Sequence, residues 1–145
     1  MDTTPIQDLY QDEFANCYGC GRNNPHGLHL KSRWEGDDCV CRHTPREVYT
    51  GGVPGFLYGG MIASLIDCHG AATAAAAKSR ESGEPIGRFV TGKLTVNFLK
   101  PTPLGVELEI RGRAIEIKNR KVTVDLQLLA DSVVCATGQV LMIQI

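Results

Sequence analysis

One stretch of small and apolar residues constrains the fold of this chain more than any other feature. Residues 61–77, MIASLIDCHGAATAAAA, are apolar or small on nearly every side, and runs of alanine strongly favour helix. A helix that is hydrophobic all round is a buried helix, not a surface one. The sequence therefore predicts one long helix over residues 59–80 that the rest of the chain must cover.

After this helix the pattern changes to a two-residue period, which is typical of half-buried strands. Apolar and polar residues alternate over 94–98, 106–111 and 122–128, and we expect a last strand over 133–145. Turn-forming residues at 101–105, 118–121 and 131–132 separate these segments. Before the helix, residues 28–34 and 39–43 predict two short strands around a turn at 36–38.

These elements predict an α+β fold, an antiparallel sheet of five to six strands wrapped around one long central helix. The helix needs cover on all sides, and each strand offers one apolar face. A chain of 145 residues has room for one domain. We divide it into an N-terminal extension, residues 1–27, with a Cys/Gly/Asn-Pro loop, and a single domain over residues 28–145.

Charge and hydropathy exclude several classes of protein. Fifteen basic and sixteen acidic residues give a formal net charge of -1, which argues against a nucleic-acid-binding protein. No apolar run reaches the ~18 consecutive residues that would span a bilayer, and the acidic start lacks the basic head and apolar middle of a signal peptide. We therefore expect a cytoplasmic protein with no membrane partner, and six reduced cysteines.

Asp67 stands out in the middle of the apolar helix. An ionised carboxylate there costs several kcal/mol of desolvation unless it is paired or hydrated. Buried carboxylates gather at functional sites. The alternative is that Asp67 faces a water-filled crevice, or bonds a neighbouring backbone group, for structural reasons, and sequence position alone favours neither interpretation.

The predicted start of the helix adds a second feature. Tyr58-Gly59-Gly60 stands where the first backbone N–H groups have no intrahelical partner. Glycines allow another group to come close, and the helix dipole favours negative charge there. This is a suitable place for an oxyanion to develop during acyl transfer, although a Gly-Gly pair on its own is more often just the end of a loop.

The spacing of these two features implies a dimer. Gly59 and Asp67 are eight residues apart, or about 12 Å along a helix axis. A group that polarises a carbonyl and a carboxylate that activates water must both reach one reacting carbon. Two antiparallel copies of the helix across a two-fold axis would bring Gly59 of one subunit to Asp67 of the other.

At this point the sequence resembles the hotdog-fold thioesterases of the phenylacetate-degradation (PaaI-like) type. That family opens its long helix with His-Gly-Gly and carries an aspartate nine residues after the histidine, and Tyr58-Gly59-Gly60 with Asp67 has that offset. Residues 97–105, NFLKPTPLG, look like the family's strand and turn after the helix, and CYGCG with NPHGL at 17–28 resembles an N-terminal motif of one branch. Tyr58 in place of histidine is a departure, because a phenol can donate a hydrogen bond but does not titrate near neutrality.

The resemblance implies an acyl-CoA thioesterase that hydrolyses a CoA thioester to free acid and CoA. By that resemblance Asp67 would be the general base or nucleophile, the Gly59-Gly60 helix start the oxyanion site beside Tyr58, and Thr91 a hydroxyl that helps position water. The candidates for the CoA phosphates are Arg88, Lys118, Arg120 and Lys121, and the alternative is that these are ordinary solvated turn residues. The expected substrate-binding residues are Phe56, Met61, Leu65, Arg88, Asn97 and Arg120.

The cysteines raise the question of a metal. Cys17 and Cys20 have the spacing of half a zinc knuckle, but structural zinc needs four ligands. The residues that could complete such a set are Cys39, Cys41, His26, His29 and His43. Cys39 and Cys41 have the wrong spacing for a second knuckle and should share one face of a strand. A redox role for Cys17 and Cys20 is not favoured either, because no strand-helix context of the thioredoxin kind precedes Cys17. We interpret Cys68 and Cys135 as small buried apolar residues and predict neither a metal nor a cofactor.

Two other classes of function stay open. A non-catalytic acyl-CoA-binding protein would be protected thermally by CoA esters yet release no thiol, and Tyr58 is the best argument for it. A protein that uses only the fold for assembly would show neither effect, and Asp67 argues against it. The expected partners are acyl-CoA and a second copy of the chain, as a homodimer or a dimer of dimers, and the acyl chain is left open.

Overall fold

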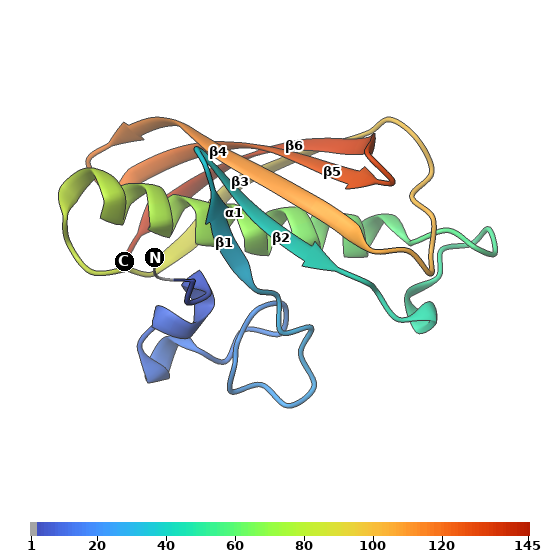
Figure 1. Cartoon of the computed structure of the whole chain (residues 1–145), viewed down its shortest axis with the longest axis horizontal. Helices are drawn as coiled ribbons and strands as arrows, with labels where there is room; N and C mark the ends of the chain where they lie inside the picture. Colours follow the sequence, from blue (N-terminus) through green and yellow to red (C-terminus); the bar gives the residue numbers. More distant parts are fainter. Residues whose placement is uncertain (1–2) are drawn as a thin grey trace.

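The computed structural model describes residues 3–145. One helix, α1 (Gly59–Ser82), lies along one face of a six-stranded antiparallel sheet (Figure 1). The strands are β1 (Ser32–Glu35), β2 (Asp38–His43), β3 (Phe89–Phe98), β4 (Leu108–Lys118), β5 (Lys121–Ala130) and β6 (Val133–Gln144). Their order in the sheet is β1-β2-β4-β5-β6-β3, so the strand that follows the helix lies at one edge. This confirms the predicted architecture.

The local sequence explains where α1 begins and ends. Tyr58, the residue before it, is extended, and Gly83 ends it in a left-handed conformation with φ 77° that glycine adopts at no steric cost. In its middle, Gly70 lies so close to β6 that a Cβ atom would come 2.6 Å from a methyl group of Val140. The missing side chain lets the helix axis approach the sheet. In the described part of the chain no helix is long and apolar enough to cross a membrane.

The strands after the helix agree with the two-residue period, and the differences lie at their ends. Asp131 and Ser132 both have positive φ, the backbone of a two-residue hairpin turn between β5 and β6. The first strand starts at Ser32 and not at residue 28 as predicted. The backbone N–H groups of Leu28 and Leu30 donate instead to the carbonyls of Tyr18 and Gly19, so the turn at 17–20 takes the place of a strand partner.

A buried polar network ties the N-terminal segment to the helix. Gln7, in the short 3-10 helix η1 (Ile6–Leu9), bonds both the hydroxyl and the backbone N–H of Ser32. Nε2 of His69 lies 2.8 Å from the carbonyl oxygen of Cys39, which can only accept, so Nε2 carries the proton and Nδ1 accepts from the Ser32 hydroxyl at 2.7 Å. Burial lowers the pKa of His69 to about 4. His69 is thus a buried, neutral histidine with both ring nitrogens hydrogen-bonded.

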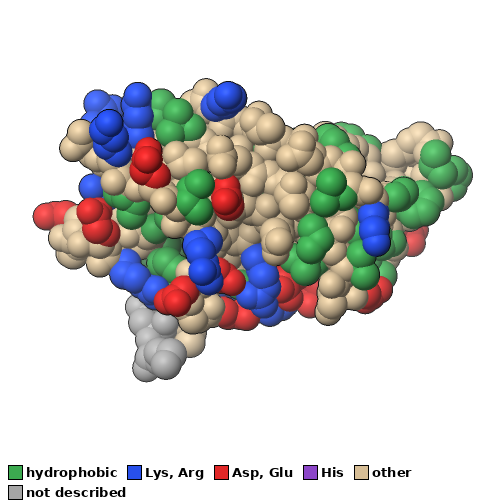
Figure 2. Space-filling view, turned by 90° about the horizontal axis from the view of Figure 1, so that it is seen from above, with side chains coloured by type: hydrophobic (Ala, Val, Ile, Leu, Met, Phe, Trp, Pro, Cys, Tyr) green, Lys and Arg blue, Asp and Glu red, His purple; other side chains and the backbone are tan. Residues whose placement is uncertain are grey.

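The helix is not covered on all sides within one chain, which corrects the expectation from its composition. A stripe that runs through Gly60, Ser64 and Asp67 is exposed or half-buried. It adjoins the edge strand β3, most of whose residues are exposed. On the face in Figure 2, acidic and basic side chains are interspersed rather than gathered by sign.

Candidate active site

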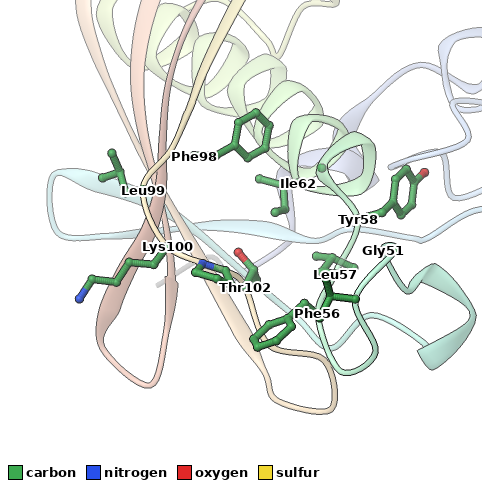
Figure 3. Close-up of a pocket in the computed structure, with 13 residues that line it drawn as sticks. Gly51, Phe56, Leu57, Tyr58, Ile62, Phe98, Leu99, Lys100 and Thr102 are labelled. Atoms are coloured by element: carbon green, nitrogen blue, oxygen red, sulfur yellow. The ribbon is translucent and has the colours of Figure 1, made fainter.

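The first turn of α1 forms one wall of an apolar cavity of about 510 Å³. The other walls are the loop before the helix and the segment that follows β3 (Figure 3). Phe56, Ile62 and Phe98 supply apolar surface, and Figure 3 shows the Phe98 ring pointing toward Ile62. Lys100 also belongs to the lining, and Figure 3 shows its amino group pointing away from the cavity. The volume and the apolar lining are typical of a small-molecule site.

The helix start presents two backbone donors at this cavity. The carbonyl of Tyr58 accepts from the N–H groups of Met61 and Ile62 at 3.1 and 3.3 Å. Among the described residues none accepts a hydrogen bond from the N–H of Gly59 or of Gly60. Gly59 lines the cavity, so an N–H and the positive end of the helix dipole are available to a ligand oxygen.

Glycine at position 60 is required by the ring of Tyr58. A Cβ atom on Gly60 would come 2.5 Å from a ring carbon of Tyr58. The same atom on Gly59 would meet only the Phe98 ring, at 3.4 Å. The Tyr58 ring therefore lies directly over the second residue of the helix, on the rim of the cavity.

The structure brings together two residues that the sequence placed in the site. The Thr91 hydroxyl donates to Oδ1 of Asp67 over 2.6 Å, a length typical of a hydroxyl bonded to a charged carboxylate. Asp67 is half-buried, and no ion pair among the described residues includes it. One neutral donor, the Thr91 hydroxyl, thus holds the carboxylate. Asp67 remains partly exposed, next to the edge strand β3.

A β-bulge aims Thr91 at the helix. The register between β3 and β6 shifts between Thr91 and Lys93, so Gly92 is an extra residue. Before the bulge the odd-numbered residues of β3 face the helix: Phe89 is buried, and Thr91 donates a hydrogen bond to Asp67. After the bulge the even-numbered residues face the helix, and Phe98 lies against its first turn. Bulges re-aim side chains at active sites. A strict two-residue period would have put Thr91 and Phe98 on opposite faces.

Other predicted binding residues do not line the cavity. Met61 and Leu65 are 1% and 0% exposed and pack in the core, because they lie on the side of α1 that faces the sheet. Asn97 lies on the outer face of β3, where its amide is 3.4 Å from the Thr137 hydroxyl. Their expected contacts with substrate stay predictions that the isolated chain does not support. Lys100, which the sequence reasoning missed, lies within the NFLKPTPLG segment that it had singled out.

The basic residues expected at the CoA phosphates do not line the cavity. The guanidinium of Arg88 stacks on the ring of Tyr10, 4.4 Å from its centroid. Nε of Arg120 donates to the carbonyl of Gln144, the partner of Phe89 at the start of β3. Within one chain these residues stay predictions for the CoA phosphates.

The structure also joins a third cysteine to the Cys17/Cys20 pair. The sulfurs of Cys17, Cys20 and Cys68 all lie within 4.8 Å of one another. Cys68 packs against the core as a small apolar residue would, but it is only half-buried and its sulfur also contacts that of Cys17. Cys39 and Cys41 share a buried face of β2, as expected. No spacing rule could have found Cys68, which is 51 residues from Cys17.

Comparison with known proteins places this architecture in a family. A family model described as the Thioesterase superfamily matches residues 54–137, more than half of the chain, from the loop before α1 into β6. The chain belongs to the thioesterase superfamily. The match covers the cavity, the helix with Asp67 and the strand with Thr91, and the predicted family and its hotdog fold are confirmed.

The thioesterase-superfamily relatives differ in how much of them this chain covers. The chain is 36% identical over 89 residues to the acyl-coenzyme A thioesterase THEM4 of Xenopus laevis, which is 61% of this chain but only 36% of that protein. A solved thioesterase superfamily protein from Shewanella loihica is 40% identical, with a TM-score of 0.72, and the match covers 94% of this chain and 99% of that one.

Two more distant solved structures share the thioesterase fold. A Streptococcus mutans protein bound to acetyl CoA is 20% identical, with a TM-score of 0.66, over 80% of this chain and 88% of that one. The PaaI protein of E. coli is 17% identical, with a TM-score of 0.68, over 81% of this chain and 80% of that one. At these identities the likeness shows the fold alone.

Proposed function

We propose that this chain hydrolyses acyl-CoA thioesters, with each active site shared by two subunits. The observation that carries the proposal is the Asp67 carboxylate of α1, which accepts a hydrogen bond from the Thr91 hydroxyl of β3. The first N–H groups of the same helix, α1, face an apolar cavity. The names of THEM4 and of the acetyl CoA complex support CoA thioesters as the substrate class.

The proposed chemistry is acyl transfer to water. The thioester carbonyl oxygen accepts from the N–H of Gly59, and the dipole of α1 stabilises the negative charge that develops on it. In one route Asp67 of the other subunit takes a proton from water, whose oxygen attacks the carbonyl carbon. The C–S bond then breaks, and the departing thiolate takes up that proton, so the products are a free acid and CoA. In the other route the carboxylate itself attacks and the thiolate leaves. Water then cleaves the acyl anhydride, which frees the acid and Asp67, and the proton released goes to the thiolate.

The exposed edge of the sheet supports the shared site. β3 is an edge strand of ten residues, and its exposed side chains include Leu94, 37% exposed, and Phe98, 57% exposed. An edge of this length is a template for pairing with another chain. A second copy of β3 paired with it antiparallel would continue the sheet and cover the open stripe of α1. That arrangement would set two α1 helices antiparallel, with Asp67 opposite the partner's helix start.

The first test is turnover of purified full-length protein on a panel of acyl-CoAs, followed by release of CoA thiol. We expect turnover with at least one ester, and loss of it in Asp67→Asn, which keeps the shape of the side chain and removes the base. If the protein gains thermal stability from CoA esters but releases no thiol above background, the non-catalytic binding alternative replaces the proposal.

A mixing experiment tests the shared site directly. Asp67→Asn and Gly59→Pro, which removes the N–H of Gly59, are each expected to be inactive. After unfolding and refolding together, half of the dimers are mixed, and each mixed dimer has one intact site, so the mixture should recover about a quarter of the wild-type activity. A mixture that stays as inactive as its components would contradict the shared geometry while leaving the hydrolysis itself intact.

A further inference from the structure

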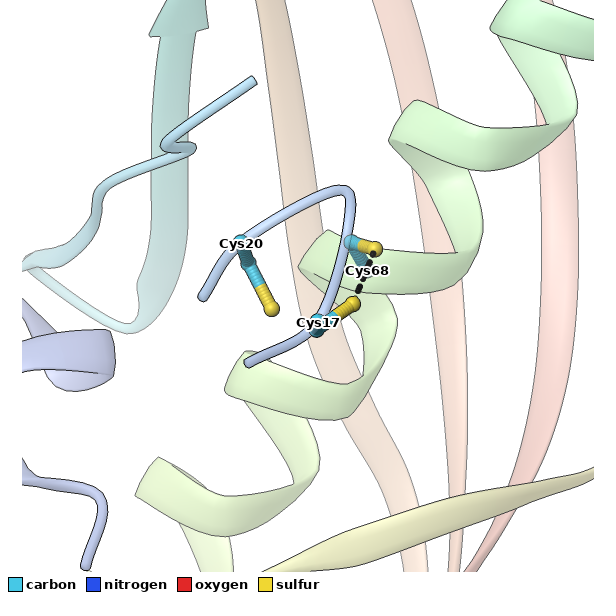
Figure 4. Close-up of side chains that lie close together, drawn as sticks. All are labelled: Cys17, Cys20 and Cys68. Atoms are coloured by element: carbon cyan, nitrogen blue, oxygen red, sulfur yellow. Dashed lines mark hydrogen bonds between the residues drawn. The ribbon is translucent and has the colours of Figure 1, made fainter. Parts of the chain in front are cut away.

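Three thiols from two distant segments converge beside the middle of α1. Cys17 and Cys20 come from the N-terminal loop and Cys68 from the helix, and their sulfurs lie within 4.8 Å of one another (Figure 4). The sulfurs of Cys17 and Cys68 are 3.8 Å apart. The proposed hydrolysis uses none of these thiols.

The loop is folded as a tight turn around the sulfur of Cys17. The N–H of Gly21 closes the turn on the carbonyl of Cys17 over 2.8 Å. The sulfurs of Cys20 and Cys68 both lie within 4.8 Å of the Cys17 sulfur. Gly19 is packed so closely that a Cβ atom would come 2.3 Å from the sulfur of Cys68.

We propose that Cys17, Cys20 and Cys68 bind one zinc ion, with water as the fourth ligand. Two sulfurs 3.8 Å apart, each ~2.3 Å from a shared ion, subtend roughly 110° at that ion, the tetrahedral angle. The other two pairs lie within 4.8 Å and need to close by at most about 1 Å, which rotation about the Cα–Cβ bonds can supply. Thiolates are the ligands that soft and borderline metals prefer.

Charge balance at the cluster supports an anionic complex. A divalent ion with three thiolates carries a net charge of minus one, and the guanidinium of Arg88 lies close enough to Cys20 to act on its charge. Nη1 of Arg88 and the phenol oxygen of Tyr10 are buried without a hydrogen-bond partner among the described residues. These groups can stabilise the complex as donors.

The binding step balances in protons. Three Zn–S bonds form, and each S–H bond that breaks releases its proton to solvent, so binding should be tighter at higher pH. The ion would then fix the N-terminal loop to α1 one residue after Asp67. A disulfide would instead need two sulfurs to approach to about 2.05 Å.

The test uses tag-free full-length protein, reduced and then freed of reductant, titrated with Cd²⁺ and with Zn²⁺ alone. We expect a thiolate-to-Cd²⁺ charge-transfer band that saturates at one ion per chain and is displaced by Zn²⁺. Cys17→Ser and Cys68→Ser should each lose the band. Cys135→Ala, which removes a thiol outside the cluster, should keep both the band and the stoichiometry.

A second readout needs no variant. Cys17 and Cys68 are the half-buried thiols of the chain. Zn²⁺ should slow their alkylation by iodoacetamide, which is located by the masses of the peptides, and should leave the alkylation rate of Cys135 unchanged. The proposal is overturned if no band forms, if Cys68→Ser binds Cd²⁺ as the wild type does, or if alkylation is unaffected by Zn²⁺. The proposal is also overturned if, in air and with Zn²⁺ present, oxygen oxidises Cys17 and Cys68 to a disulfide, seen as a loss of two hydrogen atoms in the mass of the chain. None of these outcomes depends on thioesterase activity.

Discussion

Replacing Gly59 with proline removes one hydrogen-bond donor from the start of α1 and little else. Gly59 is the first helical residue, a position where proline is favoured because its missing N–H has no intrahelical role. Tyr58 before it is extended, with φ -72° and ψ 151°, which is the conformation that a residue before proline adopts. A Cβ atom at position 59 meets only the Phe98 ring, at an ordinary 3.4 Å. The fold should therefore tolerate Gly59→Pro.

The expected effect on turnover follows from the role of that N–H. Loss of one oxyanion donor costs about 10²–10³ in kcat, or roughly 3–4 kcal/mol of transition-state stabilisation. Gly59→Ala is the matched control, because it adds a similar Cβ atom and keeps the N–H. Both variants are assayed by CoA thiol release under saturating acyl-CoA, with circular dichroism to confirm equal folding.

We expect Gly59→Ala to keep most of the wild-type kcat and Gly59→Pro to lose about two orders of magnitude or more. The reasoning is refuted if a folded Gly59→Pro retains kcat within a few-fold of Gly59→Ala. The oxyanion would then be stabilised by other groups, and the Tyr58 phenol would be the first to examine by Tyr58→Phe.

Three further predictions follow from other parts of the structure. Thr91→Val should lower kcat about tenfold or more with little change in KM, because it removes the hydrogen bond to the Asp67 carboxylate. Thr91→Ser keeps the hydroxyl and should retain activity, and equal kcat for the two variants would show that the hydroxyl has no role. The contribution of His69 to the free energy of unfolding, measured in urea, should be constant above pH 6.5 and fall by up to about 3 kcal/mol as the pH drops toward 4. The reason is that His69 takes up a proton in the unfolded chain while the buried ring stays neutral in the folded one. A His69→Gln variant with the same pH profile as the wild type would contradict this. If the chain forms the proposed dimer through β3, Leu94→Asp on that exposed edge strand should lower the mass measured by light scattering to that of a monomer. Val133→Asp, similarly exposed at the β5–β6 turn, should leave the mass unchanged.

The sequence supplied most of the architecture because periodicity reports burial directly. The alanine-rich run over 61–77 predicted α1 to within two residues at its C-terminal end, and the alternation over 122–128 located β5. The first strand failed for a physical reason. Leu28 and Leu30 satisfy their N–H groups on the turn at 17–20, a partner that lies outside any local window.

The candidate site was found in part. Asp67 was visible because a carboxylate in an apolar helix breaks the pattern, and Gly59 because glycine at a helix start frees the backbone. Thr91 was reached only through family resemblance, since the bulge at Gly92 that turns it toward Asp67 follows from pairing with β6. Met61 and Leu65 were assigned to the substrate because the sequence does not say which side of a wholly apolar helix faces the sheet.

Residue order alone thus determined which main elements this chain forms, in what order they follow, and which polar groups break their patterns, because these properties depend on neighbours within a few positions. Only the tertiary structure decided which side of α1 stays open beside β3, that Thr91 reaches the carboxylate, and that Cys68 meets Cys17 and Cys20. Those contacts join residues 24 to 51 positions apart, and their geometry depends on the register of strands and the packing of a loop, which no local pattern encodes.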